Sequence, residues 1–301
     1  DEGFPPPEGA KTIWLKNGAH DVRMVFAPAP SGAARGAVLL CTGYNEYIEK
    51  YFETARDFQG RGFAVGLLDW PGQGASDRLI ESPRLGYIRT FDTAVAAQKL
   101  AFETLKSKAG GPYIAVAHSM GGAITLEALR QNAIDPIFAL LCAPMLGLKV
   151  GPMEVAAARI ARTLGFSKLP LGAESKNTTF ETNIFTHDER RWKMNREMQA
   201  QKPDYLLKSP TVAWVNAALD LYERWRKPAA FRNLSVPLRI ASAGGESLVS
   251  NEAQHRIAER LGDKADIVTI PNARHEIWME ADQMRNLLWK EFDEMCAAYG
   301  V

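Results

Sequence analysis

Short apolar runs alternate with amphipathic segments along most of this 301-residue chain, and this alternation constrains its fold most strongly. The runs are apolar at successive positions, which is typical of parallel strands covered on both faces. They are residues Ala37–Cys41, Ala64–Leu68, Tyr113–Ala117, Ile137–Leu141, Leu238–Ala241 and Ile267–Ile270. Helical periodicity lies near Tyr51–Gln59, Phe91–Leu105, Gly121–Gln131, Asn251–Leu261 and Ile277–Ala298. This order predicts an α/β fold with a mostly parallel, doubly wound sheet.

The N-terminal region has a different pattern. Residues Thr12–Leu15 and Val22–Phe26 have strand character, and Asn17-Gly18 between them is a strong hairpin signal. We therefore expect an antiparallel hairpin ahead of the parallel part of the sheet.

The alternation stops between Met145 and Arg226, where we find no strand-like run. Helical periodicity at Met153, Ala157, Ile160 and Leu164 begins this stretch. A helical insertion between two strands is most simply a cap over the carboxyl edge of the sheet. The chain is therefore expected to divide into a core, residues 1–144 and 227–301, and a helical cap, residues 145–226. A helical domain unrelated to the site is the alternative.

Composition excludes several classes of protein. The chain has 36 Lys+Arg and 35 Asp+Glu, so it has no strongly basic surface for nucleic acid. Its apolar stretches are shorter than the roughly 20 residues of a membrane span. Cys41, Cys142 and Cys296 lack metal-type spacing, which favours free thiols in the cytoplasm and no bound metal. The chain begins with Asp1 rather than Met, which is compatible with removal of a leader.

The most informative segment is Tyr113–Gly122, which has the pattern of a strand, a small-residue turn and a helix. It fits the nucleophile elbow G-x-S-x-G around Ser119, with Ala117 in place of the first glycine. Alanine adds one methyl group to a turn that requires small residues. The serine would lie at a helix N-terminus, where backbone N–H groups stabilise developing negative charge. Ser119 is therefore the predicted nucleophile, and a structural glycine-rich turn is the alternative.

The base and the acid follow from their positions after strands. His275 directly follows the last predicted strand, so it is expected at the same edge of the sheet as Ser119. Chain order in such sites is Ser, acid, His, which places the acid between residues 119 and 275. Glu246 lies in the loop after Leu238–Ala241 and is the predicted acid. Glu252, at the start of the following helix, is the second candidate for the acid.

An oxyanion hole requires two backbone N–H groups near the nucleophile. One should belong to Met120, which follows Ser119, and the other to Tyr44, in the loop after Ala37–Cys41. Gly43 permits the sharp turn in that loop, and Glu46 is expected either to brace it or to be solvated.

With these residues the chain resembles the α/β-hydrolase superfamily, and more narrowly the lysophospholipases and monoacylglycerol lipases. The family's H-G-x-x-E-H loop matches residues 42–47 except that Thr42 and Tyr47 stand in place of its two histidines, and its D-x-R-G-x-G-x-S loop matches residues 69–76 except for Pro71. The family's acid is an aspartate where this chain has Glu246. The segments 183–188 and 209–214 resemble the bacterial lysophospholipase branch.

These features predict a carboxylic ester hydrolase that acts on lysophospholipid-like or monoacylglycerol-like esters through an acyl-enzyme, without a cofactor. Gly43 and two residues of the cap, Met145 and Trp214, are the predicted substrate contacts. Acyl transfer and amide or peptide cleavage by the same triad remain open, as does a non-catalytic binding protein. The expected partner is a small acyl ester or lipid rather than nucleic acid, and transient contact with a membrane surface is compatible with it. The sequence leaves the oligomeric state open.

Overall fold

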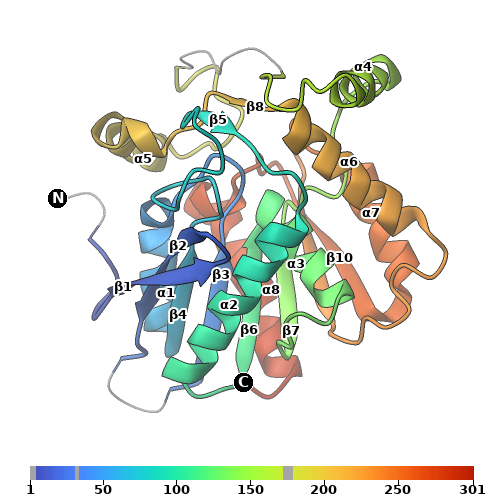
Figure 1. Cartoon of the computed structure of the whole chain (residues 1–301). Coiled ribbons are helices and arrows are strands. Elements are labelled where there is room, and N and C mark those ends of the chain that lie inside the picture. Colours follow the sequence, from blue (N-terminus) through green and yellow to red (C-terminus); the bar gives the residue numbers. More distant parts are fainter. Residues whose placement is uncertain (1–4, 31–33, 172–178) are drawn as a thin grey trace.

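The computed structural model describes residues 5–30, 34–171 and 179–301, and its centre is one eight-stranded sheet (Figure 1). β1 and β2 form an antiparallel hairpin, β2 pairs antiparallel with β4, and every other pair in this sheet is parallel. The predicted fold class is therefore confirmed. In sheet order the strands are β1 (Lys11–Asn17), β2 (His20–Ala27), β4 (Phe63–Leu68), β3 (Gly36–Cys41), β6 (Tyr113–His118), β7 (Phe138–Cys142), β9 (Leu238–Ala243) and β10 (Ala265–Ile270).

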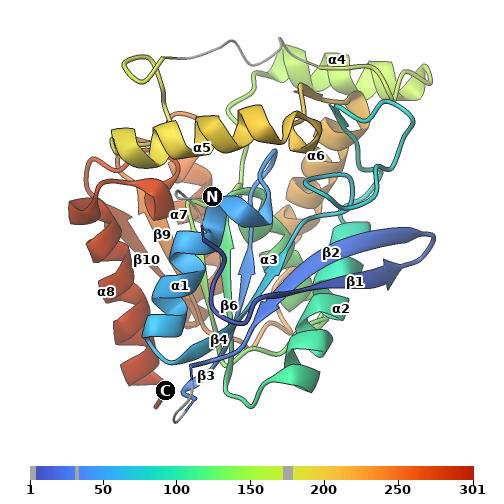
Figure 2. The ribbon, with the colours of Figure 1, turned by 90° about the vertical axis from the view of Figure 1, so that its left-hand side faces the viewer.

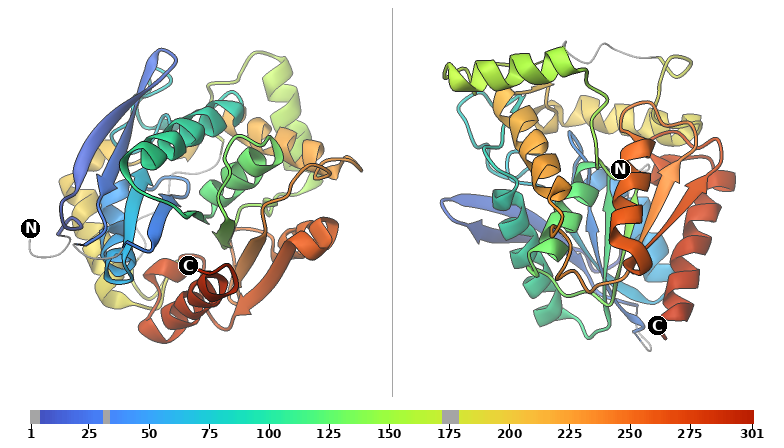
Figure 3. Two further views of the ribbon diagram at one scale, coloured as in Figure 1. Left: turned by 90° about the horizontal axis from the view of Figure 1, so that it is seen from below. Right: turned by 90° about the vertical axis from the view of Figure 1, so that its right-hand side faces the viewer.

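Helices cover both faces of the sheet, as the view from below shows (Figure 3). One face packs against α1 (Phe52–Gly60) and α8 (Asp282–Ala298), and the other packs against α2 (Asp92–Lys108), α3 (Met120–Arg130) and α7 (Asn251–Leu261). Alternate residues of the central strands enter the two resulting cores. In β3, for example, Leu39 belongs to the core under α2 and α3, and Leu40 to the core under α1 and α8. Successive apolar residues in these strands are explained by this double coverage.

Short 3₁₀ helices complete several connections. They are Ile48–Tyr51, Pro203–Tyr205, Gly262–Lys264 and Ile277–Met279. The first follows β3 and the last follows β10, so both lie in loops that leave the carboxyl edge of the sheet.

The chain between β7 and β9 contains α4 (Pro152–Thr163), α5 (Glu189–Gln201) and α6 (Val212–Arg226). In Figures 1 and 2, α4 and α5 lie across one end of the molecule, beyond the strands. The expectation of no strand here was wrong, because β8 (Ser209–Pro210) pairs in parallel with β5 (Leu85–Gly86). Two-residue strands are too short to produce a periodicity in the sequence.

Parts of the predicted core and cap lie outside the described residues. These are residues 1–4 and 31–33 of the core and residues 172–178 of the cap. Among the helices that the structure describes, none is long and apolar enough to cross a membrane.

Candidate active site

Ser119 lies in a sharp turn between β6 and α3. Its backbone has φ 51° and ψ −116°, a conformation that side-chain-bearing residues rarely adopt. Two neighbouring segments hold it there: Ser119 N–H donates to the Cys142 carbonyl at 3.0 Å, and Met145 N–H donates to the Ser119 carbonyl at 2.9 Å. The turn therefore projects the Ser119 side chain from the carboxyl edge of the sheet, as the elbow pattern predicted.

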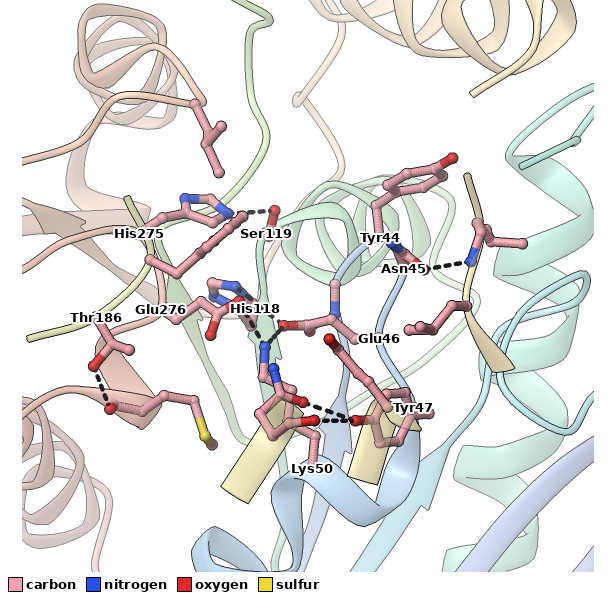
Figure 4. Close-up of a pocket in the computed structure, with 18 of the residues that line it drawn as sticks. Tyr44, Asn45, Glu46, Tyr47, Lys50, His118, Ser119, Thr186, His275 and Glu276 are labelled. Atoms are coloured by element: carbon pink, nitrogen blue, oxygen red, sulfur yellow. Dashed lines mark hydrogen bonds and ion pairs between the residues drawn. The ribbon is translucent and has the colours of Figure 1, made fainter. Parts of the chain in front are cut away.

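His275 hydrogen-bonds to both Ser119 and Glu246, and Figure 4 shows its contact with Ser119. Its Nε2 lies 2.9 Å from Ser119 Oγ and its Nδ1 lies 2.7 Å from Glu246 Oε2. His275 is 5% exposed and the Glu246 side chain is fully buried, so little water competes for these hydrogen bonds. The structure thus brings together three residues that are far apart in the sequence, at the distances required for proton transfer.

Backbone and side-chain donors hold the Glu246 carboxyl in its ionised form. Burial by itself raises the pKa of Glu246. The adjacent His275 ring and the N–H groups of Leu248 and Val249 lower this pKa by more than burial raises it, so the net shift is downward. These N–H groups lie 2.7 and 3.3 Å from Glu246 Oε1, which leaves Oε2 for the imidazole. By contrast, Glu252, the second candidate for the acid, is exposed and pairs with Arg256 on the surface of α7.

The loop after β3 packs directly against the first turn of α3. A Cβ on Gly121 would lie 2.5 Å from the Thr42 carbonyl oxygen, so only glycine allows this approach. Gly43 and Tyr44 line the same cavity as Ser119. The predicted oxyanion donors, Tyr44 N–H and Met120 N–H, therefore belong to two segments in contact beside the serine.

Glu46 braces this loop from inside the protein. Gly43 N–H donates to Glu46 Oε2, Tyr51 OH donates to the same oxygen at 2.7 Å, and the Lys50 ammonium lies 2.6 Å from Oε1. Burial raises the pKa of Glu46, but the charge and hydrogen bond of Lys50, with the Tyr51 hydrogen bond and nearby His118, lower it to about 2. Of the two expectations for Glu46, the brace matches this geometry.

His118 precedes the serine and lies against His275, with ring centroids 4.8 Å apart. Burial lowers its pKa to about 3, so this ring is neutral at pH 7. Its Nδ1 lies 3.2 Å from the Cys142 carbonyl oxygen, so Nδ1 carries the proton and donates. The His118 ring therefore hydrogen-bonds to the backbone of β7, and His275 is the imidazole that hydrogen-bonds to Ser119.

A cavity of about 640 Å³ opens at Ser119 and His275. Its floor is formed by the loops at the carboxyl edge of the sheet, and α5 contributes Trp192, Asn195 and Gln199 to its wall. Part of its lining is apolar and includes Leu148, Phe185, Leu206, Leu207, Leu248 and Val249. The cavity also has cationic lining residues, Lys50, Arg84, Arg191, Arg196 and Lys208. It is large enough for a small ligand with an apolar part and a polar part.

Of the three predicted substrate contacts, the structure places Gly43 in this cavity and the other two outside its lining. Met145 is 3% exposed and packs in the core beneath the elbow, because the chain folds back there after β7. Trp214 lies on the inner side of α6, where its ring packs on Tyr44 at 4.8 Å and on Phe91 at 5.9 Å. It is therefore behind the loop that holds Tyr44.

Sequence reasoning missed the residues that join the loops of the site. Glu276 follows His275 and pairs with Lys50 at 2.6 Å, and Asn45 Oδ1 accepts a hydrogen bond from Leu207 N–H at 2.6 Å. The four-residue spacing of Glu46 and Lys50 favours an ion pair between these two residues, but it does not point to Glu276. No local pattern indicates the contact of Glu276 with Lys50 or that of Asn45 with Leu207.

Among the described residues, no group of three or more His, Cys, Asp or Glu side chains is arranged to hold a metal ion. Cys41, Cys142 and Cys296 are buried and free.

Comparison with known proteins places this chain in a family. The chain is 29% identical over 286 residues to lysophospholipase L2 of Escherichia coli, covering 90% of this chain and 83% of that protein. It is 25% identical to monoacylglycerol lipase of Mycolicibacterium smegmatis, covering 88% and 90%. A soluble variant of monoglyceride lipase from Saccharomyces cerevisiae has the same fold, with a TM-score of 0.76 at 15% identity over 96% of both chains.

The model of one protein family, described as serine aminopeptidase, S33, matches residues 32–282. This match spans the elbow, the acid loop, the histidine loop and the helices between β7 and β9. The chain therefore belongs to this family of α/β-hydrolases, whose serine hydrolases include homologous lysophospholipases and monoacylglycerol lipases.

Proposed function

We propose that this protein is a serine carboxylic ester hydrolase that cleaves monoacyl lipid esters through an acyl-enzyme. The observation that supports this most directly is the hydrogen-bonded chain from Ser119 through His275 to Glu246 at the cavity of about 640 Å³. The ester-hydrolase relatives agree with it.

In the proposed reaction, His275 Nε2 takes the proton of Ser119 Oγ as this oxygen attacks the acyl carbonyl carbon. Glu246 accepts the Nδ1–H hydrogen bond, which holds the imidazole in the required tautomer and stabilises its cation. The imidazolium then donates its proton to the leaving alcohol oxygen as the C–O bond breaks. A water molecule, deprotonated by the same imidazole, attacks the acyl-enzyme and releases the carboxylic acid and free Ser119.

The oxyanion of each tetrahedral intermediate would be held by the N–H groups of Tyr44 and Met120. Both are backbone donors on structured segments, so they need little reorganisation when charge develops. The hydrogen bond from Gly43 N–H to Glu46 fixes the peptide that precedes Tyr44.

The cavity and the relatives support the proposed substrate class. An acyl chain would contact apolar residues such as Leu148, Leu248 and Phe185, and a polar head group would face Asn195 and Gln199 of α5. Lysophospholipids and monoacylglycerols have this division, and two relatives are named for them. Residues 145–226 would act as the cap that shapes this cavity.

An aminopeptidase activity is the second candidate, because the family description names it. Such an enzyme needs a carboxylate to bind the free α-ammonium group of its substrate. Of the described residues that line the cavity, the acidic ones are Glu46 and Glu276, and both pair with Lys50. This charge distribution favours an ester with an uncharged or anionic head group.

A fluorophosphonate probe tests the nucleophile. We expect single labelling of the wild-type protein, none of Ser119→Ala, and normal labelling of the control Ser107→Ala on the surface of α2. Hydrolysis of monoacylglycerol, lysophosphatidylcholine and aminoacyl 4-nitroanilides then separates the candidates. Labelled Ser119→Ala protein would contradict the proposed nucleophile, and turnover of the anilides alone would contradict the proposed substrate class.

A further inference from the structure

Lys50 lies buried between two carboxylates beneath the candidate site (Figure 4). Its ammonium is 2.6 Å from Glu46 Oε1 and 2.6 Å from Glu276 Oε1, and its side chain is 3% exposed. The side chains of Glu46 and Glu276 are 6% and 12% exposed. The three groups therefore form a buried cluster with one excess negative charge.

Such a cluster is a poor way to stabilise a fold. Removing three charged groups from water costs several kcal/mol per ion, and apolar side chains of similar volume are often equally stable or better. A buried charged cluster retained next to a reaction centre is therefore better explained by what it positions.

The two carboxylates belong to the two loops that must meet around the substrate. Glu46 accepts the Gly43 N–H hydrogen bond and so orients the loop that presents Tyr44 N–H. Glu276 is bonded directly to His275 in the chain. Lys50 thus joins the oxyanion loop to the histidine loop through side chains that do not touch Ser119.

We propose that Lys50 is a positioning residue that sets the oxyanion loop relative to His275, through Glu46 on one side and Glu276 on the other. This inference rests on the proposed function. If Lys50 were lost, Glu46 and Glu276 would repel each other, and the Tyr44 N–H would move away from the position where the oxyanion forms.

The test compares Lys50→Met with Lys50→Arg. Loss of one oxyanion donor lowers kcat by about 100-fold to 1000-fold in serine hydrolases, so we expect Lys50→Met to lower kcat by at least about tenfold with KM nearly unchanged. The rate of fluorophosphonate labelling should fall in parallel. Lys50→Arg should recover most of kcat because arginine can still bridge two carboxylates. The matched control is Lys16→Met, which removes a lysine from an exposed ion pair with Asp21.

Glu276→Gln keeps the inference testable if Lys50→Met does not fold, because it leaves a neutral Glu46–Lys50 pair. We expect the same loss in kcat at constant KM. Wild-type kcat in Glu276→Gln or in Lys50→Met would overturn the inference, as would an effect confined to KM or to thermal stability. If wild-type protein is labelled at Ser119 and these variants are unaffected, the positioning role fails while the proposed function stands.

Discussion

At the scale of single residues, Glu246 offers a sharp test, because the resemblance to the lysophospholipases predicts an aspartate at this position. We expect Glu246→Gln to lower kcat by about 1000-fold or more, since the amide removes the charge that stabilises the imidazolium. Glu246→Asp should keep part of the activity, because the charge remains and only reach is lost. Glu252→Gln is the matched control: its side chain is 82% exposed and should not affect steady-state kinetics. Wild-type turnover in Glu246→Gln would reassign the acid.

At the scale of elements, two tryptophans of segment 145–226 should behave differently. Trp192 on α5 lines the cavity, so Trp192→Ala should change KM and the preference for acyl-chain length. Trp214 on α6 packs behind Tyr44, so Trp214→Ala should destabilise the protein by about 3–5 kcal/mol and lower kcat through the loosened Tyr44 loop. Steady-state kinetics on esters of several chain lengths, with urea unfolding, measure both effects. An identical chain-length profile in both variants would contradict this division.

At the scale of the whole molecule, His118 makes stability depend on pH. Its pKa is about 3 in the folded protein because it is buried, against 6.5 for an ordinary histidine. The unfolded chain therefore binds a proton between these values that the folded chain does not. Stability should be full above about pH 6.5 and fall as the pH drops toward 3, by up to about 1.4 kcal/mol per pH unit. Urea unfolding from pH 5 to 8 measures this dependence of stability on pH. His118→Gln should make stability depend less on pH, whereas His255→Gln, at an exposed histidine, should leave the dependence unchanged.

Much of the fold could be predicted because its signals are local. A run such as Ala37–Cys41 lies in a strand buried on both faces, and its composition shows this before any contact is known. The elbow is equally local, since its strained Ser119 backbone and its small neighbours lie within five residues. Glu246 and His275 could be predicted because loops that follow parallel strands emerge at one edge of the sheet.

Local sequence patterns could not predict the direction in which a side chain points. Met145 and Trp214 are apolar residues of the right segment, but whether such a residue enters the cavity or the core depends on how α6 turns against α2 and the elbow. Met153, Ile160 and Leu164 recur at helical spacing in and just after α4, yet they are exposed. The direction in which they point is decided in the same manner by Asp220 on α6, which pairs with Arg159 and Arg162 of α4. The short β5–β8 pair joins segments more than a hundred residues apart.

The sequence by itself thus determined the order of strands and helices, the position of the elbow, and which acid and which histidine could join it, because each depends on residues near one another in the chain. Only the tertiary structure decided the Glu46–Lys50–Glu276 cluster, the residues that line the cavity and the exposed face of α4. These depend on contacts between distant segments, and the free energy of such contacts is set by burial and charge in the folded state rather than by any local pattern.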